Sequence, residues 1–171
     1  MKLQFDFNVD KATETIYVAR EFAAGLDLVW DAWTKAEMLD KWWGPKPWRA
    51  ATKEMDFREG GRWLYAMVSP ENQAHWCLVE FIKIDPKTGY STQNSFCDEN
   101  GNSANSGFTG FTPISWDNTF KAGTETTTVD VVIKMASLDE LERFLAMGFK
   151  EGFTMGLGNL DEYLSTLVAS K

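Results

Sequence analysis

Few side chains in this sequence are suited to chemistry, and their types limit the possible reactions. His75 is the only histidine among 171 residues. A Ser-His-Asp or Cys-His arrangement would therefore need it, and a metal site with two histidines is excluded. His75 closely follows a turn at residues 72–73, where we expect an exposed or edge position, and histidine needs positioned partners to act in catalysis. Arg62 and Glu80 are the other polar candidates for a cavity, but long charged side chains on antiparallel strands usually face water. The sequence therefore predicts no catalytic residue.

The two cysteines do not form a metal or redox motif. Cys77 and Cys97 fall in different predicted strands, and neither has partners at the spacing of a metal site. We expect buried free thiols, as is usual inside cells, with a cross-strand disulfide as the alternative. Gly60-Gly61 is typical of a turn, and the glycines of residues 148–156 have helical spacing, so no phosphate-binding loop is indicated. We expect neither a metal ion nor another cofactor.

Aromatic residues are the more informative group, because they supply large contact area and make good walls for ligand pockets. Several predicted strands alternate a large aromatic with a smaller neighbour, so each strand can turn one ring toward a cavity. A shift of one residue in register would reverse every side chain of a strand, so the set depends on the predicted faces. The predicted lining is Trp43, Trp63, Tyr65, Trp76, Phe96, Trp116, Phe149, Gly152, Gly156 and Asn159.

The first part of the chain predicts one strand and two short helices. Residues 13–24 contain β-branched and aromatic side chains and precede a glycine, which is typical of a strand. Over residues 26–33, apolar side chains recur at spacings of three and four, which predicts a helix. Thr34, with Glu37 three residues later, matches a capping box and predicts a second helix through Trp43.

The middle of the chain predicts repeated short strands. Turn signals rich in glycine, proline, asparagine and aspartate separate them, which favours antiparallel hairpins. The polar segment 98–107 is the longest predicted loop and the one we expect to be most mobile. The predicted strands cover residues 52–57, 62–69, 74–84, 88–97, 108–120 and 125–135.

A long helix is predicted after the last strand. In that strand Val129, Val131 and Ile133 lie on one face, so the sheet has a dry side that needs a cover. Ser137 and Glu140 form a capping box, and no proline interrupts the pattern up to about residue 168, which predicts a helix of roughly 45 Å. Three glycines on its inner face indicate tight packing against the sheet, room for a bound molecule, or both.

Length and composition indicate a single domain spanning residues 1–171, with its core at about 13–168. The chain is 44% hydrophobic, which is enough for one sizeable core. Its net charge is −8 and its 17 basic residues are scattered, so we expect neither nucleic acid nor an anionic membrane as partner. Nothing approaches the roughly 18 apolar residues of a membrane span. We expect a cytoplasmic monomer or homodimer.

The order of these elements resembles the START-like superfamily, also called the polyketide cyclase and birch-pollen-allergen superfamily. Three segments look like the subfamily named for the C-terminal domain of the activator of heat-shock protein 90 ATPase: residues 28–34 leading to 39–45, residues 57–63, and residues 147–153 with Leu157 and Leu160. The resemblance extends from about Thr13 to Leu167. It implies an α+β helix-grip fold, in which a curved antiparallel sheet of about six or seven strands wraps a long C-terminal helix.

Three functions fit this sequence. Non-enzymatic binding of a small hydrophobic molecule between the sheet and the helix ranks first, because of the aromatic strands and the glycine face. An interaction module for a chaperone ATPase, implied by the resemblance, ranks second. A cyclase-like or hydratase-like enzyme ranks third, because the sequence offers few titratable side chains that would converge in the cavity.

Overall fold

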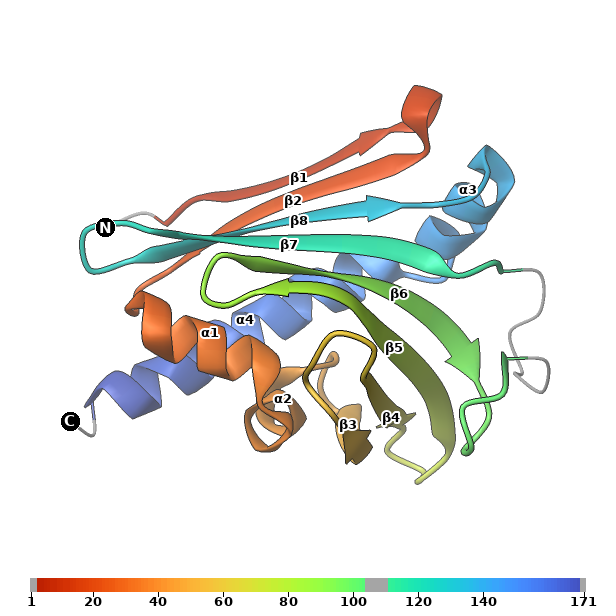
Figure 1. Ribbon diagram of the computed structural model, residues 1–171, viewed down its shortest axis with the longest axis horizontal. Coiled ribbons are helices and arrows are strands. Elements are labelled where there is room, and N and C mark those ends of the chain that lie inside the picture. Colours follow the sequence, from red (N-terminus) through yellow and green to blue (C-terminus); the bar gives the residue numbers. More distant parts are fainter. Residues whose placement is uncertain (1–2, 104–110, 170–171) are drawn as a thin grey trace.

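One antiparallel sheet with a long helix across it dominates the fold (Figure 1). The structure is a computed structural model that describes residues 3–103 and 111–169. Within these residues, eight strands lie in the order β1-β2-β8-β7-β6-β5-β4-β3. The strands are Phe5–Asp10 (β1), Thr15–Phe22 (β2), Arg49–Met55 (β3), Arg62–Val68 (β4), Ala74–Asp85 (β5), Gly89–Cys97 (β6), Ile114–Ala122 (β7) and Thr127–Lys134 (β8). The helices are the 3-10 turn Lys11–Thr13 (η1), Leu26–Thr34 (α1), Ala36–Trp42 (α2), Leu138–Ala146 (α3) and Phe149–Ala169 (α4).

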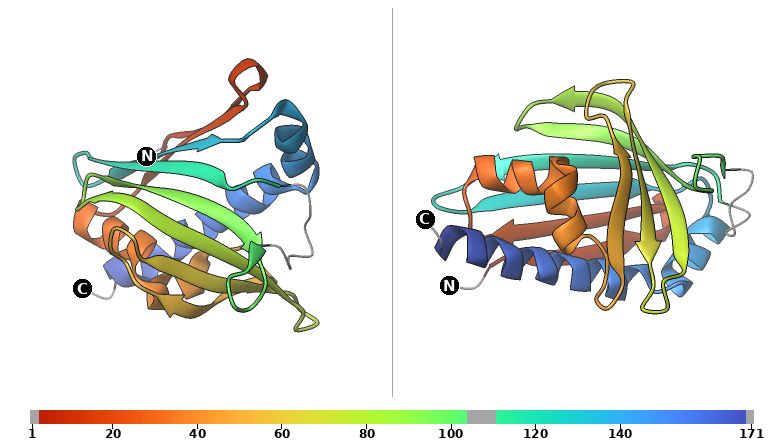
Figure 2. Two further views of the ribbon diagram at one scale, coloured as in Figure 1. Left: turned by 45° about the vertical axis from the view of Figure 1, so that its right-hand side comes forward. Right: turned by 90° about the horizontal axis from the view of Figure 1, so that it is seen from below.

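The sheet curves and buries one face against α4 (Figure 2). Along β8, Val129, Val131 and Ile133 are each at most 2% exposed and alternate with more exposed neighbours, as their spacing predicted. Consecutive strands from β3 to β8 form antiparallel hairpins, and β2 joins the far edge of β8. The predicted helix-grip α+β fold is confirmed, but the described residues form eight strands instead of the expected six or seven.

The edge strand β1 was not predicted. Phe5 and Phe7 alternate with exposed Asp6 and Asn8, and the strand pairs with β2 in a register that sets Phe5 opposite Arg20. Its partly buried phenylalanines pack against the main core. The alternation was readable, but polar residues at every second position made this segment resemble an unstructured start.

Helices α1 and α2 fall where predicted, but the cap between them differs. The hydroxyl of Thr34 donates to the carbonyl of Trp30 at 2.8 Å and so does not cap α2. Lys35 occupies the N-cap position of α2 without a side-chain hydrogen bond. The predicted capping box at Thr34 and Glu37 is therefore wrong, because the hydroxyl finds an acceptor one turn earlier in the same helix.

The predicted C-terminal helix is two helices. Ser137 caps α3, with its Oγ accepting from the Glu140 N–H at 3.1 Å, as predicted. Gly148, at φ +93°, then lies in the left-handed region and ends the first helical run. The 21 residues of α4 extend about 32 Å and lie along the concave face of the sheet. The prediction of one uninterrupted helix was wrong because glycine can break a helix without a proline.

The predicted loop 98–107 is only partly described. In its described part, the carboxylate of Asp98 accepts from the N–H groups of Asn100 at 2.8 Å and Asn102 at 2.9 Å. These contacts form a local turn. The remainder of that loop, and the start of the predicted strand 108–120, lie outside the described residues.

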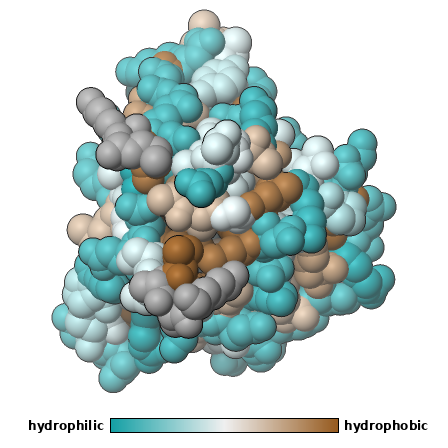
Figure 3. Space-filling view, turned by 90° about the vertical axis from the view of Figure 1, so that its left-hand side faces the viewer, coloured by the Kyte–Doolittle hydropathy of each residue, from teal (hydrophilic) through white to brown (hydrophobic). Residues whose placement is uncertain are grey.

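Hydrophilic side chains cover most of the face in Figure 3, and a group of apolar side chains lies near its centre. Among the exposed large apolar residues, Tyr17, Ile82 and Met155 lie on β2, β5 and α4. None of the helices in residues 3–103 and 111–169 is both long and apolar enough to cross a membrane.

Candidate ligand-binding cavity

A cavity of about 430 Å³ lies between strands β4 to β7 and the first half of α4. The loop between α2 and β3 closes one side, and the junction of α3 and α4 closes another. The cavity is partly open to solvent, and half-buried Trp48 and exposed Met147 belong to its lining. Its volume falls in the range of about 300–1,000 Å³ that is typical of small-molecule sites.

The sheet contributes a mostly apolar wall. Tyr65 lies opposite Cys77 in the β4–β5 register, and Val79 is two residues further along β5, so these side chains project to the same face. All three line the cavity, together with Ile114 and Trp116 from β7. Because these strands are neighbours in one curved sheet, their inward residues form a continuous surface.

Helix α4 contributes aromatic rings and glycines. Phe149 and Phe153 stack with ring centroids 5.2 Å apart, and Trp116 meets both rings edge to face. A Cβ atom at Gly152 would lie 3.6 Å from Pro45 Cγ, and one at Gly156 would lie 3.6 Å from the nitrogen of Gly44. These are ordinary contact distances, and both glycines also line the cavity. The two glycines thus pack close to the loop after α2 and also leave open space in the cavity.

Two hydrogen bonds hold the loop that follows α2 over the cavity. Asn159 Nδ2 of α4 donates to the carbonyl of Gly44 at 2.8 Å. The indole N–H of Trp43 donates to the hydroxyl of Tyr65 at 2.9 Å. Trp43 also meets Trp63, Trp116 and Phe153 ring to ring, at centroid distances between 5.6 and 6.2 Å. The loop is therefore fixed to both walls of the cavity.

Two titratable groups of the wall, the thiol of Cys77 and the hydroxyl of Tyr65, keep their protons at neutral pH. Burial raises the pKa of Cys77 to about 12 and holds the pKa of Tyr65 well above its ordinary value. Within the described part of the chain, no group of three histidine, cysteine, aspartate or glutamate residues lies close enough together to hold a metal ion. The wall is thus suited to apolar contact with a few neutral polar groups.

Most predicted lining residues lie together on the cavity wall. The seven that do are Trp43, Tyr65, Phe96, Trp116, Phe149, Gly152 and Gly156. Trp63 instead borders a smaller adjoining recess. Asn159 does not border the cavity but binds the carbonyl of Gly44. That any of these residues contacts a ligand remains a prediction.

The predicted orientation of Trp76 is wrong. In the register of β4 and β5, Trp76 pairs with Ala66, whereas Cys77 pairs with the inward-facing Tyr65. Trp76 therefore faces the convex side, where it packs on a separate cluster of Leu64, Leu78 and Cys97. A one-residue error in the predicted face of β5 reversed its alternation.

The same reversal concealed residues that do line the cavity. His75, Cys77 and Val79 all line it from β5, although none was predicted to. His75 also packs against Trp48 with ring centroids 5.5 Å apart. The neighbouring strand β4 could have indicated the correct face of β5. Trp63 and Tyr65 on β4 pair with Val79 and Cys77, and paired residues point to the same face of a sheet.

Solved structures of similar proteins cover nearly the whole chain. A crystal structure of a Mycobacterium smegmatis protein is 28% identical, with a TM-score of 0.85 over 95% of this chain and 97% of that one. A solution structure of an Arthrobacter aurescens protein is 22% identical, with a TM-score of 0.86 over 94% and 91% of the two chains. The AHSA1 protein from Silicibacter pomeroyi is 18% identical, with a TM-score of 0.70 over 89% and 98%.

The chain also matches a family profile, whereas no curated protein sequence matches it significantly. The profile is that of the Activator of Hsp90 ATPase homolog 1-like proteins, and it covers residues 23–165. The match includes the loop at Gly44 and the glycines of α4 that shape the cavity. Because it spans most of the sequence, this protein belongs to the Activator of Hsp90 ATPase homolog 1-like family.

Proposed function

We propose that this protein binds a small, largely apolar molecule in the cavity between its sheet and α4. The observation that carries the proposal is the cavity itself, about 430 Å³ in volume and walled mainly by aromatic and aliphatic side chains. Removing apolar ligand surface from water stabilises a complex by about 25 cal/mol per Å². The wall also supplies a few neutral polar groups, which is the usual composition of a small-molecule site.

The glycines of α4 leave the cavity unfilled. Filling the space would need only ordinary side chains at Gly152 or Gly156, because a Cβ atom at either position meets nothing closer than 3.6 Å. Glycine inside a helix costs up to about 1 kcal/mol relative to alanine. Two such residues on the cavity side of α4 therefore retain space at some cost to the helix.

Titration with the neutral fluorescent probe N-phenyl-1-naphthylamine tests this function. We expect saturable fluorescence enhancement with the unmodified protein and at least a tenfold loss of affinity in Gly152→Leu, because leucine would occupy the cavity. Gly158→Leu is the matched control: it adds the same side chain to the same helix, but Gly158 does not line the cavity and has no atom within 4 Å of a Cβ there.

Two further measurements complete the test. Bound probe should raise the melting temperature in proportion to its occupancy, because a ligand that binds only the folded state stabilises it. Native mass spectrometry of protein purified without denaturation should retain any molecule acquired from the cell. Equal probe affinity in both leucine variants, each folded by circular dichroism, would contradict binding in this cavity.

Family membership favours a second candidate, contact with a chaperone ATPase. The name of the family refers to activation of the Hsp90 ATPase. The measurement is the steady-state ATPase rate of Hsp90 with increasing amounts of this protein at physiological salt. A rise that is preserved in Gly152→Leu would favour this role and would separate it from the cavity.

A further inference from the structure

Three buried polar atoms without a partner belong to residues that line one small recess beside the cavity. They are the indole nitrogens of Trp33 and Trp116 and the side-chain oxygen Oδ1 of Asn118. These residues are 3%, 6% and 5% exposed, so bulk water does not solvate them. Within the described residues, only one other buried side-chain atom lacks a partner, Nε of Arg20. Leaving a buried donor or acceptor unpaired is unfavourable, so three such atoms on residues around one recess require an explanation.

The three residues border the same small recess. Its volume is about 20 Å³, and a site of roughly 10–15 Å³ by this measure is enough for one water molecule. The recess can therefore hold one water molecule or one hydroxyl group. It shares Trp43, Val79, Asn94 and Trp116 with the wall of the main cavity, so a molecule in that cavity lies beside it.

Neighbouring polar groups already have partners. The hydroxyl of Thr92 donates to Oδ1 of Asn94 at 2.6 Å, and the hydroxyl of Tyr90 donates to the carbonyl of Trp33 at 3.2 Å. Both side chains border the recess as well. Among the described residues that line the recess, the buried side-chain atoms left without a partner are the two indole N–H donors and the one amide acceptor.

We propose that the recess binds one hydroxyl oxygen, which accepts from both indole N–H groups and donates to Asn118. A hydroxyl or a water molecule can do this, because its oxygen has two lone pairs and at least one O–H. A carbonyl or carboxylate oxygen has no proton for Asn118, and an ammonium group has no lone pair for the indoles. This hydroxyl site rests on the proposed function and specifies the class of ligand. The ligand would be an apolar alcohol or phenol, and its hydroxyl would replace a water molecule bound in the free protein.

A high-resolution crystal structure of the free protein tests the water. We expect one ordered oxygen within 3.2 Å of each of the three atoms, a normal hydrogen-bond distance. Co-crystals with 1-naphthol should show the naphthol oxygen at the same place and the water displaced. An empty recess in the free protein would overturn the proposal without bearing on ligand binding in the main cavity.

A pair of matched probes tests the ligand class. We expect 1-naphthol to bind about tenfold more tightly than naphthalene in calorimetric titrations, because its hydroxyl gains partners that naphthalene lacks. In Asn118→Leu, which removes the acceptor and fills the recess, the preference should fall to within twofold. Thr119→Val is the control, because the adjacent residue on β7 is exposed.

The outcomes separate this inference from the proposed function. Equal affinity of the two probes in the unmodified protein, or a naphthol preference that survives Asn118→Leu, would overturn the hydroxyl site while leaving a ligand-binding cavity. Failure of both probes and of N-phenyl-1-naphthylamine to bind would count against the proposed function and the ligand class together. The free crystal structure would then still decide whether the recess holds an oxygen.

Discussion

At the scale of single residues, the thiol of Cys77 reports on how well the cavity wall excludes water. Burial raises its pKa from 9.0 to about 12, and the nearby Tyr65 hydroxyl acts in the opposite direction. The thiolate is the reactive form, so its fraction at pH 8 falls with the raised pKa. We predict that Cys77 in a Cys97→Ser variant reacts with Ellman's reagent at least about 100-fold more slowly than free cysteine.

The same shift predicts how stability depends on pH. Because the folded-state pKa of Cys77 is raised, the unfolded chain loses this proton first as pH rises above about 9, and the free energy of unfolding falls from there toward pH 12.

The control for the reaction with Ellman's reagent is the reciprocal variant, Cys77→Ser, which reports on Cys97, whose pKa burial raises to about 11. A rate for Cys77 close to that of free cysteine would show that water reaches the wall.

The orientation of individual side chains was the least predictable part of the site. On β5 both alternating sets are apolar, because Trp76 and Leu78 pack on a convex-side cluster while Cys77 and Val79 face the cavity. A sheet with apolar residues on both faces has no period-two signal to choose between them. Trp116 was predictable because its neighbours on β7 are polar.

At the scale of elements, the break between α3 and α4 depends on Gly148. Its φ of +93° is a conformation that side-chain-bearing residues rarely adopt, whereas Gly158 lies inside α4 with an ordinary helical backbone. We predict that Gly148→Ala destabilises the protein by about 1–2 kcal/mol. Gly158→Ala should instead stabilise it by up to about 1 kcal/mol. Urea unfolding measures both, and the same sign in the two variants would contradict the assigned break.

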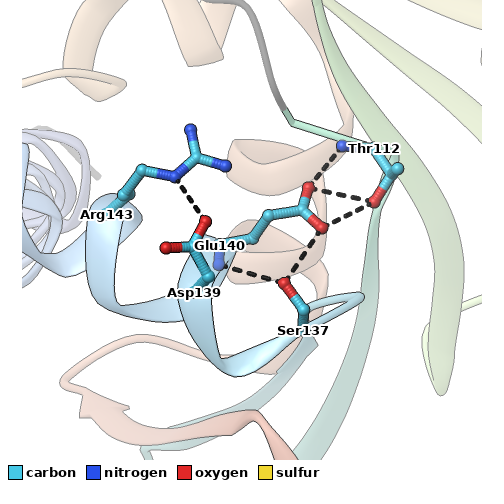
Figure 4. Close-up of polar contacts among 5 residues, drawn as sticks. All are labelled: Thr112, Ser137, Asp139, Glu140 and Arg143. Atoms are coloured by element: carbon cyan, nitrogen blue, oxygen red, sulfur yellow. Dashed lines mark hydrogen bonds and ion pairs between the residues drawn. The ribbon is translucent and has the colours of Figure 1, made fainter.

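The start of α3 is held by a buried carboxylate (Figure 4). Glu140, only 8% exposed, accepts from the N–H of Thr112 at 2.5 Å and from its hydroxyl at 3.0 Å. We predict that Glu140→Ala lowers the free energy of unfolding by about 1–3 kcal/mol, because the Thr112 N–H loses its acceptor.

The matched control for this contact is Glu142→Ala on the same helix. Glu142 is 54% exposed and only 3.7 Å from Lys11, a surface ion pair worth about 0–1 kcal/mol. Glu140→Gln retains an acceptor oxygen and should recover part of the loss. Equal effects of the two alanine variants in chemical denaturation would show that the Thr112 contact contributes no more than a surface pair.

Element order was predictable, whereas interruptions and edges were not. Turn residues correctly indicated where the hairpin strands end. Ser137 and Glu140 correctly indicated the start of α3, where the N–H of Glu140 donates to Oγ of Ser137. The left-handed Gly148 and the edge strand β1 were missed because each depends on tertiary packing: φ at a glycine is not encoded by residue type, and β1 pairs only with β2.

At the scale of the whole molecule, one core connects almost every element. The main cluster joins Ile16 of β2, Trp30 of α1, Trp42 of α2 and Leu160 of α4 with the inward residues of the sheet. The convex-side cluster around Leu64 is small by comparison. Since the sheet is continuous from β1 to β3, neither half has a separate core on which to fold alone.

This continuity predicts a single cooperative unfolding transition. Tryptophans buried in the main cluster report on tertiary packing, while far-ultraviolet circular dichroism reports on the sheet and helices, so the two midpoints in urea should coincide. Because the cavity lies inside this same core, 1-naphthol should move both midpoints equally if it binds there. A fluorescence transition that precedes the loss of circular dichroism would instead identify a separately unfolding part, and the ligand would then move only the transition of the part that contains the cavity.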